Sequence, residues 1–593
     1  MKLKHLYMLG AVALMTASCN EDRFLDLKPQ GSLNEDIMTS TEGADLLVNA
    51  AYAALGGPEG QSWSVWCHPT SNWTYGEVRS DNAYKGGGVG DLNEVHRMET
   101  FDMDATNGFL DSKWYHLYCS VQRCNSALRV LNAATDEQVN GRVSRIAEMK
   151  VLRAHYYFEL SRLFNKIPYF DENVEISQYP DIPNNEFTRD EILSMLAKEM
   201  LDAAEQLPAS QPEVGRIHKY IALAYAAKIK LYQAYQQDEI THAVTSINKE
   251  LLREVVSLCD QVTASNRYGL LDDFQGLDLV TNENGKESVF AIQYSMNDGT
   301  ESAGRINWSN LLNSPGGGSP YGGDGFFLPS QDLINAYQTD ANGLPDFNYQ
   351  SKSDYSWAVL NNGVYTLQNT TPNVDPRLDF VVGRPTITWK TYPDKPCEGW
   401  VRDKDTYGYN CAKRFWVSPE SSDMFNGWPW GASQLNWQII RYADILLWKA
   451  EALIELNEGN GLETARDLIN QIRNRARNSA YVKDFNDHSK YAANYLVNPY
   501  PADVWNQDYA RQALRWETRL EKALEGERFF DLVRWGIVET TMNKYITAES
   551  DNRIYYANAH FTGGKDEYYP VPNNQYGFSG GKYVQNPGYA PFN

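Results

Sequence analysis

Residues 142–164 read RVSRIAEMKVLRAHYYFELSRLF. Apolar residues recur in this stretch at steps of three and four, so they line one side of a helix. The stripe consists of Met149, Leu152, Tyr156, Leu160 and Leu163. The same periodicity predicts helices in the neighbouring stretches 114–133, 188–207, 216–235 and 249–264. Pro208 and Gly215 mark a turn between two of these helices.

A second helical block covers residues from about 440 to 545. Its first helix has an apolar stripe of Tyr442, Leu446, Ala450 and Leu453. After the turn Glu458-Gly459-Asn460-Gly461, the next stripe consists of Ala465, Leu468, Ile472 and Ala476. Helices paired by short turns favour a mainly α, tetratricopeptide-like scaffold of helical hairpins, although no repeat of about 34 residues is recognisable.

Between the two helical blocks the composition changes. Residues 301–440 contain eight of the 16 Trp and 11 of the 25 Pro residues. The glycine-rich runs at 315–318 and 321–325 cannot lie inside helices. We therefore expect a large irregular, loop-rich insertion in the helical scaffold, and loops of this kind often carry function.

Charge and aromatic content restrict the possible partners. The formal net charge of −22 disfavours nucleic acids, anionic membrane surfaces and sulfated polysaccharides. Aromatic residues make up 13% of the chain, with 38 Tyr, 21 Phe and 16 Trp. Most of them are expected in the core. A minority is suited to sugar binding, because a pyranose stacks its C–H face on an aromatic ring while polar side chains bind its hydroxyls.

The N-terminus resembles a lipoprotein signal. Lys2 and Lys4 precede a short apolar run that ends at Ser18-Cys19. We expect cleavage before Cys19 and acylation of the new terminus. No other segment reaches the about 18 consecutive apolar residues of a membrane span. The acidic start at residues 20–22 resembles the export tag of a surface-displayed lipoprotein.

The cysteines suggest no disulfide framework. Cys119 and Cys124 lie five residues apart on one predicted helix, which is a poor geometry for a bridge. Cys397 and Cys411 lie in loop-rich sequence, where pairing stays open.

Local motifs for catalysis or metal binding are weak. The nine histidines form no HExxH motif, and there is no GxSxG motif or P-loop. Residues 102–113 start like an EF-hand but lack its pattern further on, so a structural calcium stays open. A glycosidase needs only two suitably placed carboxylates, so a glycoside hydrolase remains one alternative. A protein-binding helical-repeat scaffold is another. We expect no cofactor.

Several segments together resemble the SusD/RagB family. They are Phe24-Leu25-Asp26 with Pro29, Trp114–Leu131, Ala147–Phe170, Tyr442–Leu456, Leu468–Arg477, Glu525–Gly536 (EGERFFDLVRWG), Tyr569–Pro572 and Gln585–Tyr589. Thr518 and Lys522 depart from the family pattern, which usually has Arg and Leu there. Within EGERFFDLVRWG, the spacing of Arg528, Asp531 and Arg534 indicates ion pairs that fix helix packing rather than a catalytic site.

The resemblance implies a non-catalytic glycan-binding lipoprotein on the cell-surface face of the outer membrane. Its expected partners are a neutral glycan, a TonB-dependent transporter barrel and, through acylated Cys19, membrane lipid. The predicted organisation is a signal peptide at 1–18, a tether and arm at 19–40, scaffold at 41–270 with an aromatic loop at 61–90, a glycan-binding region at 271–440, and scaffold with a closing segment at 441–593.

Two loops are the candidate binding regions, Trp63–Tyr84 and Asn307–Tyr321, because members of the family bind glycans at corresponding places. The candidate contacts in these loops are Trp66, Trp73, Tyr75, Arg79, Asp81, Asn82, Trp308 and Tyr321. Trp357 and Trp430, outside the two loops, are further candidates. The alternative is that Trp73 and Asp81 are core and cap residues that pack their loop. On the binding hypothesis, Trp73→Ala and Trp308→Ala weaken glycan binding and leave the thermal transition nearly unchanged.

Overall fold

The computed structural model describes residues 39–57, 63–299, 305–356, 358–361, 364–367, 372–396, 398–428 and 430–592. Long helices dominate it, as predicted, in two groups. The first comprises α4 (Thr41–Ala53), α7 (Gly108–Ala133), α8 (Arg142–Phe164), α9 (Arg189–Gln206), α10 (Lys219–Ala234) and α11 (Lys249–Ala264). The second comprises α15 (Tyr442–Leu456), α16 (Gly461–Asn478) and α17 (Gln507–Glu521). None of the described helices is both long and apolar enough to cross a bilayer.

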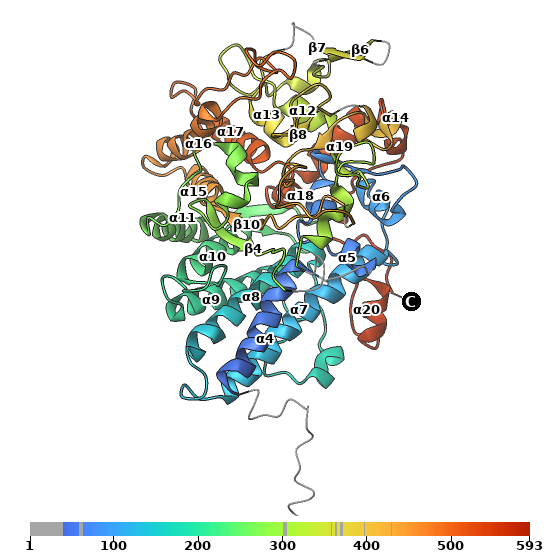
Figure 1. The fold of residues 1–593 in the computed structure, drawn as a ribbon. Coiled ribbons are helices and arrows are strands. Elements are labelled where there is room, and N and C mark those ends of the chain that lie inside the picture. The colour runs from blue at the N-terminus through green and yellow to red at the C-terminus, as the bar shows by residue number, and fades with distance from the viewer. Residues whose placement is uncertain are drawn as a thin grey trace, which may run out of the picture.

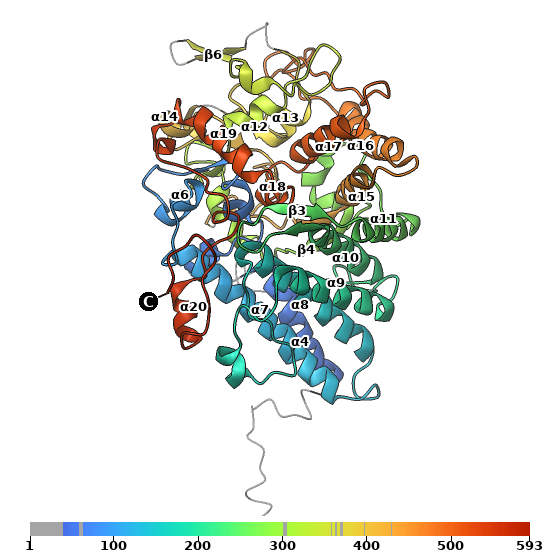
Figure 2. The same ribbon diagram turned by 180° about the vertical axis from the view of Figure 1, so that it is seen from behind.

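Successive helices pack side by side in one continuous array. Each helix from α7 to α11 contacts the next, α11 contacts α15, and α15 contacts α16. Figure 1 shows this array rising from α7 and α8 to α15 and α16. In the view from behind, the C-terminal α20 (Asn573–Phe578) lies beside α7 (Figure 2). The predicted mainly α, tetratricopeptide-like scaffold is confirmed.

Helix α8 lies in the middle of the first group. The five residues of its predicted apolar stripe are buried, and so is every residue from Val151 to Phe164. The reason is that α7 and α9 both pack against α8, so almost no side of it faces water. Polar residues in the helix are therefore paired: Arg162 forms ion pairs with Glu159 and Glu527.

A two-stranded sheet lets the helical array continue past the irregular region. Strand β4 (Ser288–Ile292) pairs antiparallel with β10 (Trp437–Arg441), with Ile292 opposite Trp437 and Ser288 opposite Arg441. The pairing brings together the two ends of the irregular region between residues 292 and 437. Helix α15, which starts directly after β10, can therefore pack on α11.

A second sheet joins the aromatic loop to this region. Strand β1 (Ala83–Gly86) pairs antiparallel with β5 (Phe326–Pro329). Its register places Ala83 opposite Pro329 and Gly86 opposite Phe326. The first candidate loop is thus covered by residues more than 200 positions further along the chain.

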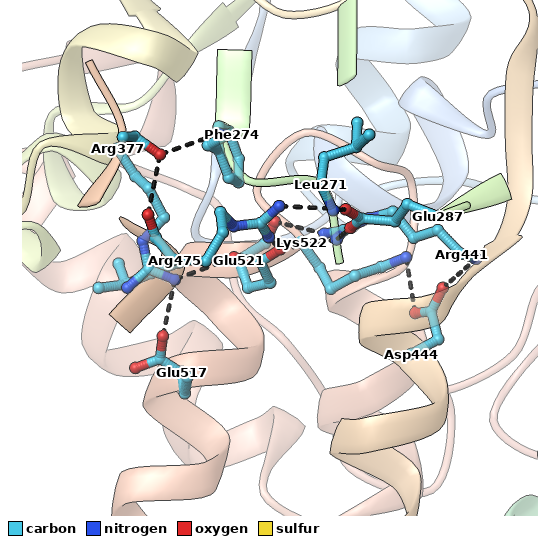
Figure 3. Close-up of polar contacts among 12 residues, drawn as sticks. Leu271, Phe274, Glu287, Arg377, Arg441, Asp444, Arg475, Glu517, Glu521 and Lys522 are labelled. Atoms are coloured by element: carbon cyan, nitrogen blue, oxygen red, sulfur yellow. Dashed lines mark hydrogen bonds and ion pairs between the residues drawn. The ribbon is translucent and has the colours of Figure 1, made fainter. Parts of the chain in front are cut away.

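A buried ionic network fastens α15, α16 and α17 to the irregular region (Figure 3). The Arg441 Nη1 lies 2.6 Å from Glu521 Oε1 and 3.0 Å from Glu287 Oε1. Arg475 also pairs with Glu521 and Glu287, and Arg377 pairs with Glu521. Burial alone would raise the pKa of Glu521, but the guanidinium groups of Arg475, Arg441 and Arg377 lower it to about 2.

Lys522, one of the departures from the family pattern, belongs to the same network. Its ammonium lies 2.7 Å from Asp444 and 2.6 Å from Glu525. These carboxylates raise the pKa of Lys522 although burial opposes them. In the following segment Arg534 pairs with Asp531 at 2.8 Å, as the spacing predicted, whereas Arg528 pairs with Asp81 instead.

A candidate aromatic binding face

The first candidate loop is part of the core. Trp73 and Tyr75 are fully buried, and Arg79 is only 1% exposed. The Trp73 ring packs against Phe326 and Phe327 from β5. The Tyr75 hydroxyl donates to Cys67 O at 2.7 Å.

The polar residues of this loop also have their partners inside the protein. The Arg79 guanidinium lies 3.8 Å from the centre of the Tyr569 ring. Asp81 forms ion pairs with Arg528 at 2.8 Å and with Arg519 at 3.3 Å. Burial raises the pKa of Asp81, but the two arginines outweigh burial and lower it to about 2. Asn82 donates to Glu77 at 3.0 Å and accepts from Arg519 at 2.9 Å.

The expectation that this loop exposes a sugar platform is therefore wrong for Trp73, Tyr75, Arg79, Asp81 and Asn82. A sugar cannot stack on a ring that other side chains already cover, nor bind groups whose hydrogen bonds are made inside the protein. The alternative that Trp73 and Asp81 pack the loop describes them correctly, Trp73 as a core residue and Asp81 through buried ion pairs.

Tyr321 requires the same correction. It is 2% exposed, its hydroxyl donates to Val417 O at 2.6 Å, and it accepts from the Trp389 indole N–H at 2.9 Å. These two bonds anchor the start of the glycine-rich loop 321–325. Trp357 lies outside the described residues, as do Cys19 and Cys397. Among the described residues, Cys119 and Cys124 are not bridged, and no group of three His, Cys, Asp or Glu side chains could hold a metal.

Of the remaining candidates, Trp66 and Trp308 lie together, and Trp430 is two positions from Trp428, whose ring contacts Trp308. Trp66 and Trp308 belong to one small apolar cluster, separate from the main core, which also contains Val65 and Ile306. The Trp308 ring contacts that of Trp428, with centroids 5.2 Å apart and planes at 60°. Trp428 and Trp430 are 42% and 44% exposed, whereas Trp308 is 7% exposed. We call Trp66, Trp308, Trp428 and Trp430 the tryptophan face.

Trp428 was missed in the sequence analysis. A signal was present, because the segment Gly427-Trp428-Pro429-Trp430-Gly431 concentrates two indoles between glycines. Gly427 and Gly431 have φ values of 95° and 71°, which side chains with a Cβ rarely adopt. These two glycines let the described residues on either side of the indoles turn back, with both rings exposed.

Backbone bonds hold this turn in place. The Phe425 N–H donates to Ala432 O at 2.8 Å, which closes the base of the turn. Ser433 N–H then donates to Asn307 Oδ1 at 3.1 Å, and Asn307 N–H donates to Ser433 O at 3.3 Å. Because Asn307 precedes Trp308, the turn and the Trp308 segment are fixed to each other.

A cavity of about 470 Å³ lies beside Trp308. Its lining includes Asn49 and Tyr52 from α4, Gln293 and Tyr294 from the segment after β4, and Arg305. A volume in this range accommodates a small ligand. Amide and guanidinium groups next to aromatic rings are the chemistry that sugar hydroxyls and sugar C–H faces require.

The glycine-rich loop adjoins the other side of the face. A Cβ placed on Gly322 would lie 3.9 Å from the Trp430 ring, so the loop backbone passes close to this indole. Arg402 holds the loop by donating to Asp324 O at 3.2 Å, and it pairs with Asp91 at 2.9 Å. Arg402 therefore fixes the loop whose Gly322 lies near the Trp430 ring.

Comparison with known proteins gives consistent similarities. A family model described as "SusD family" matches residues 286–589, and one described as "Starch-binding associating with outer membrane" matches residues 23–231. A SusD-like protein of Bacteroides ovatus is 22% identical over 552 residues, covering 89% of this chain and 82% of that protein.

Solved structures resemble the fold. A SusD superfamily protein from Bacteroides vulgatus has a TM-score of 0.66 at 20% identity, covering 93% of this chain and 99% of that chain. The surface glycan-binding protein A from Bacteroides thetaiotaomicron, in complex with laminarihexaose, has a TM-score of 0.61 at 19% identity, covering 92% and 99% of the two chains. At this level of identity the similarity concerns the fold.

Proposed function

The chain belongs to the SusD family, and from this premise we propose that it captures a neutral polysaccharide at the tryptophan face without cleaving it. The observation that carries the proposal is the pair of exposed indoles of Trp428 and Trp430, because the Trp428 ring contacts Trp308, which lines a cavity with polar groups. Exposed aromatic rings gathered in one patch are typical of a binding site.

The chemistry of the face suits a pyranose chain. The indole rings offer flat surfaces for sugar C–H groups, and stacking contributes about 0.5–1.5 kcal/mol per ring beyond area burial. Asn49, Gln293 and Arg305 line the cavity and can bind hydroxyls. Because each contact is modest, binding needs several of them at once. The net charge of −22 favours a neutral over an anionic polymer.

Binding to a polysaccharide panel tests this proposal. Electrophoresis in gels that contain laminarin, starch, xylan or galactomannan should retard the wild-type protein in at least one polymer. The variant Trp428→Ala/Trp430→Ala should migrate nearly as in the polymer-free gel. Tyr115→Ala is a matched control, because Tyr115 is an aromatic residue on α7 that is 57% exposed.

The same panel tests whether the protein cleaves its ligand. We expect no reducing ends after prolonged incubation with any polymer. Release of reducing sugar that persists after further purification would identify a glycoside hydrolase. Wild-type migration of the double tryptophan variant would instead remove the site assignment.

The matching family description associates such proteins with the outer membrane. We infer further that this chain is anchored there through acylated Cys19, faces the cell exterior and passes its glycan to a TonB-dependent transporter. Affinity purification from detergent-solubilised outer membranes tests the last step. A large barrel protein should co-purify in stoichiometric amounts, and its absence under conditions that preserve other outer-membrane complexes would contradict the partnership.

A further inference from the structure

The connection between α16 and α17 contains a second aromatic group, remote in sequence from the tryptophan face. Tyr481, Tyr491 and Tyr495 lie together, with ring centroids 5.3 Å (481–491), 5.2 Å (481–495) and 6.2 Å (491–495) apart. We propose that this group, the tyrosine hairpin of residues 481–495, is a second carbohydrate-binding surface that takes another part of the same neutral polysaccharide. The proposal rests on the glycan-binding function proposed above.

The hairpin is an ordered structure rather than a loose loop. Ala492 N–H donates to Val482 O at 3.0 Å, and Asp484 N–H donates to Lys490 O at 3.0 Å. At the tip, Asp484 Oδ1 accepts from the backbone N–H groups of Asn486 and Asp487. These bonds restrict the backbone conformations of the hairpin that carries the rings. A restricted backbone loses less conformational entropy when a ligand binds.

Two of the three rings are anchored through their hydroxyl groups. Tyr481 donates to Arg477 O at 2.9 Å. Tyr495 donates to the Asp379 carboxylate, which is itself paired with Arg384 at 2.7 Å and buried. These bonds fix the two rings as a base.

Tyr491 differs from the other two. It is 54% exposed, and its hydroxyl makes no hydrogen bond to any described residue. The Lys483 ammonium lies 3.9 Å from the centre of its ring and has no carboxylate partner in the described part of the chain. The Lys483 ammonium covers one face of the Tyr491 ring, so the exposed remainder of the ring is the part that a pyranose can contact. The Tyr491 hydroxyl and the ammonium are the hydrogen-bond donors beside it.

The hairpin and the tryptophan face belong to one connected part of the molecule. Thr388 Oγ1 donates to Lys483 O at 3.0 Å, and the neighbouring Trp389 donates to the Tyr321 hydroxyl at 2.9 Å. Tyr321 begins the Tyr321–Gly325 run, whose Gly322 lies against Trp430. Two binding surfaces held at a constant separation bind a long polymer more tightly than a short one, because the second contact becomes intramolecular.

Comparison of a polymer with a short oligosaccharide tests this inference. The probes are the same four polysaccharides in affinity gels and, for the best-retained polymer, its hexasaccharide in titration calorimetry. Tyr491→Ala should lower apparent polymer affinity by about threefold to tenfold, which is the loss of one stacked ring. Its hexasaccharide affinity should stay near that of the wild type, because the tryptophan face is intact. Tyr115→Ala should change neither value.

The double tryptophan variant provides the second arm. If the hairpin binds by itself, Trp428→Ala/Trp430→Ala keeps a weak polymer retardation that the addition of Tyr491→Ala removes. The hairpin site is overturned if Tyr491→Ala is retarded as strongly as the wild type. It is also overturned if the double tryptophan variant is not retarded at all. Neither result affects the tryptophan face. If none of the four polymers retards the wild type, the proposed function and the hairpin site both fail.

Discussion

At the scale of single residues, Trp73 and Trp428 show how differently one residue type is used. The Trp73 ring is enclosed by Phe326 and Phe327, whereas the Trp428 ring meets Trp308 on one side and solvent on the other. Removing the buried ring leaves a large cavity, and Trp→Ala changes of this kind cost about 3–5 kcal/mol. Removing an exposed ring costs little stability.

We therefore predict that Trp73→Ala lowers the thermal unfolding midpoint by many degrees, while Trp428→Ala leaves it nearly unchanged. This prediction replaces the expectation from the sequence that Trp73→Ala spares the thermal transition. Differential scanning fluorimetry of the two purified variants beside the wild type is sufficient. A Trp73→Ala protein that unfolds at the wild-type temperature would contradict the burial of this loop.

At the scale of elements, the turn from Trp73 to Glu77 packs directly against the turn before α18 (Arg528–Arg534). A Cβ on Gly76 would lie 1.8 Å from Gly526 O, so only glycine fits there. Glu77 completes the contact by accepting from the backbone N–H of Gly526 at 2.9 Å and of Glu527 at 3.2 Å. This contact ties the N-terminal loop to the C-terminal helices.

Gly76→Ala is expected to separate these two elements and to destabilise the protein by about 1–3 kcal/mol or more, as overpacking does. Gly90→Ala is the matched control, because no atom lies within 4 Å of a Cβ at that position. Thermal midpoints and the yield of soluble protein are the readouts. Equal midpoints for the two variants would contradict the close approach at Gly76.

The ionic network around Glu521 on α17 makes the stability of the fold depend on pH. The pKa of Glu521 is about 2 in the folded protein, against 4.5 for an unperturbed glutamate. A carboxyl with a depressed pKa stabilises the fold fully above its unfolded pKa, and this contribution is lost as the pH falls from 4.5 towards 2. Removing one partner of a buried charge group costs about 3–5 kcal/mol.

Glu521→Gln should accordingly be much less stable than the wild type at pH 7, and the difference should shrink between pH 5 and pH 3. Glu250→Gln is the control, because Glu250 pairs with Arg253 on the surface and its side chain is 80% exposed. Denaturant midpoints at several pH values measure both effects. A difference that is independent of pH would exclude the charge of Glu521 as its source.

At the scale of the whole molecule, one prediction concerns Cys19, which lies outside the described residues. We predict that the mature chain starts at Cys19 and carries acyl groups there. Intact-mass measurement of membrane-extracted protein should show the added lipid mass. Cys19→Ala should appear in the soluble fraction, and its retention in the membrane fraction would contradict the anchor.

The sequence by itself determined the scaffold. Helical periodicity is local, so the apolar stripe of residues 149–163 could be read without knowing what packs on it. The same holds for the stripes from Tyr442 to Ala476, and for the loop-rich character of the region between the blocks. Family-like segments spread along the chain added the expected function.

Only the tertiary structure decided which aromatic residues are buried and which are exposed. Trp73 and Asp81 look exposed in sequence, but their partners Phe327, Arg519 and Arg528 lie more than 250 residues away. Trp428 reaches Trp308 from about 120 positions along the chain, through a turn closed by its own backbone bonds. Burial depends on such long-range contacts, and a local sequence pattern contains no information about them. The helices were therefore predictable from the sequence, whereas the burial or exposure of each candidate aromatic residue was not.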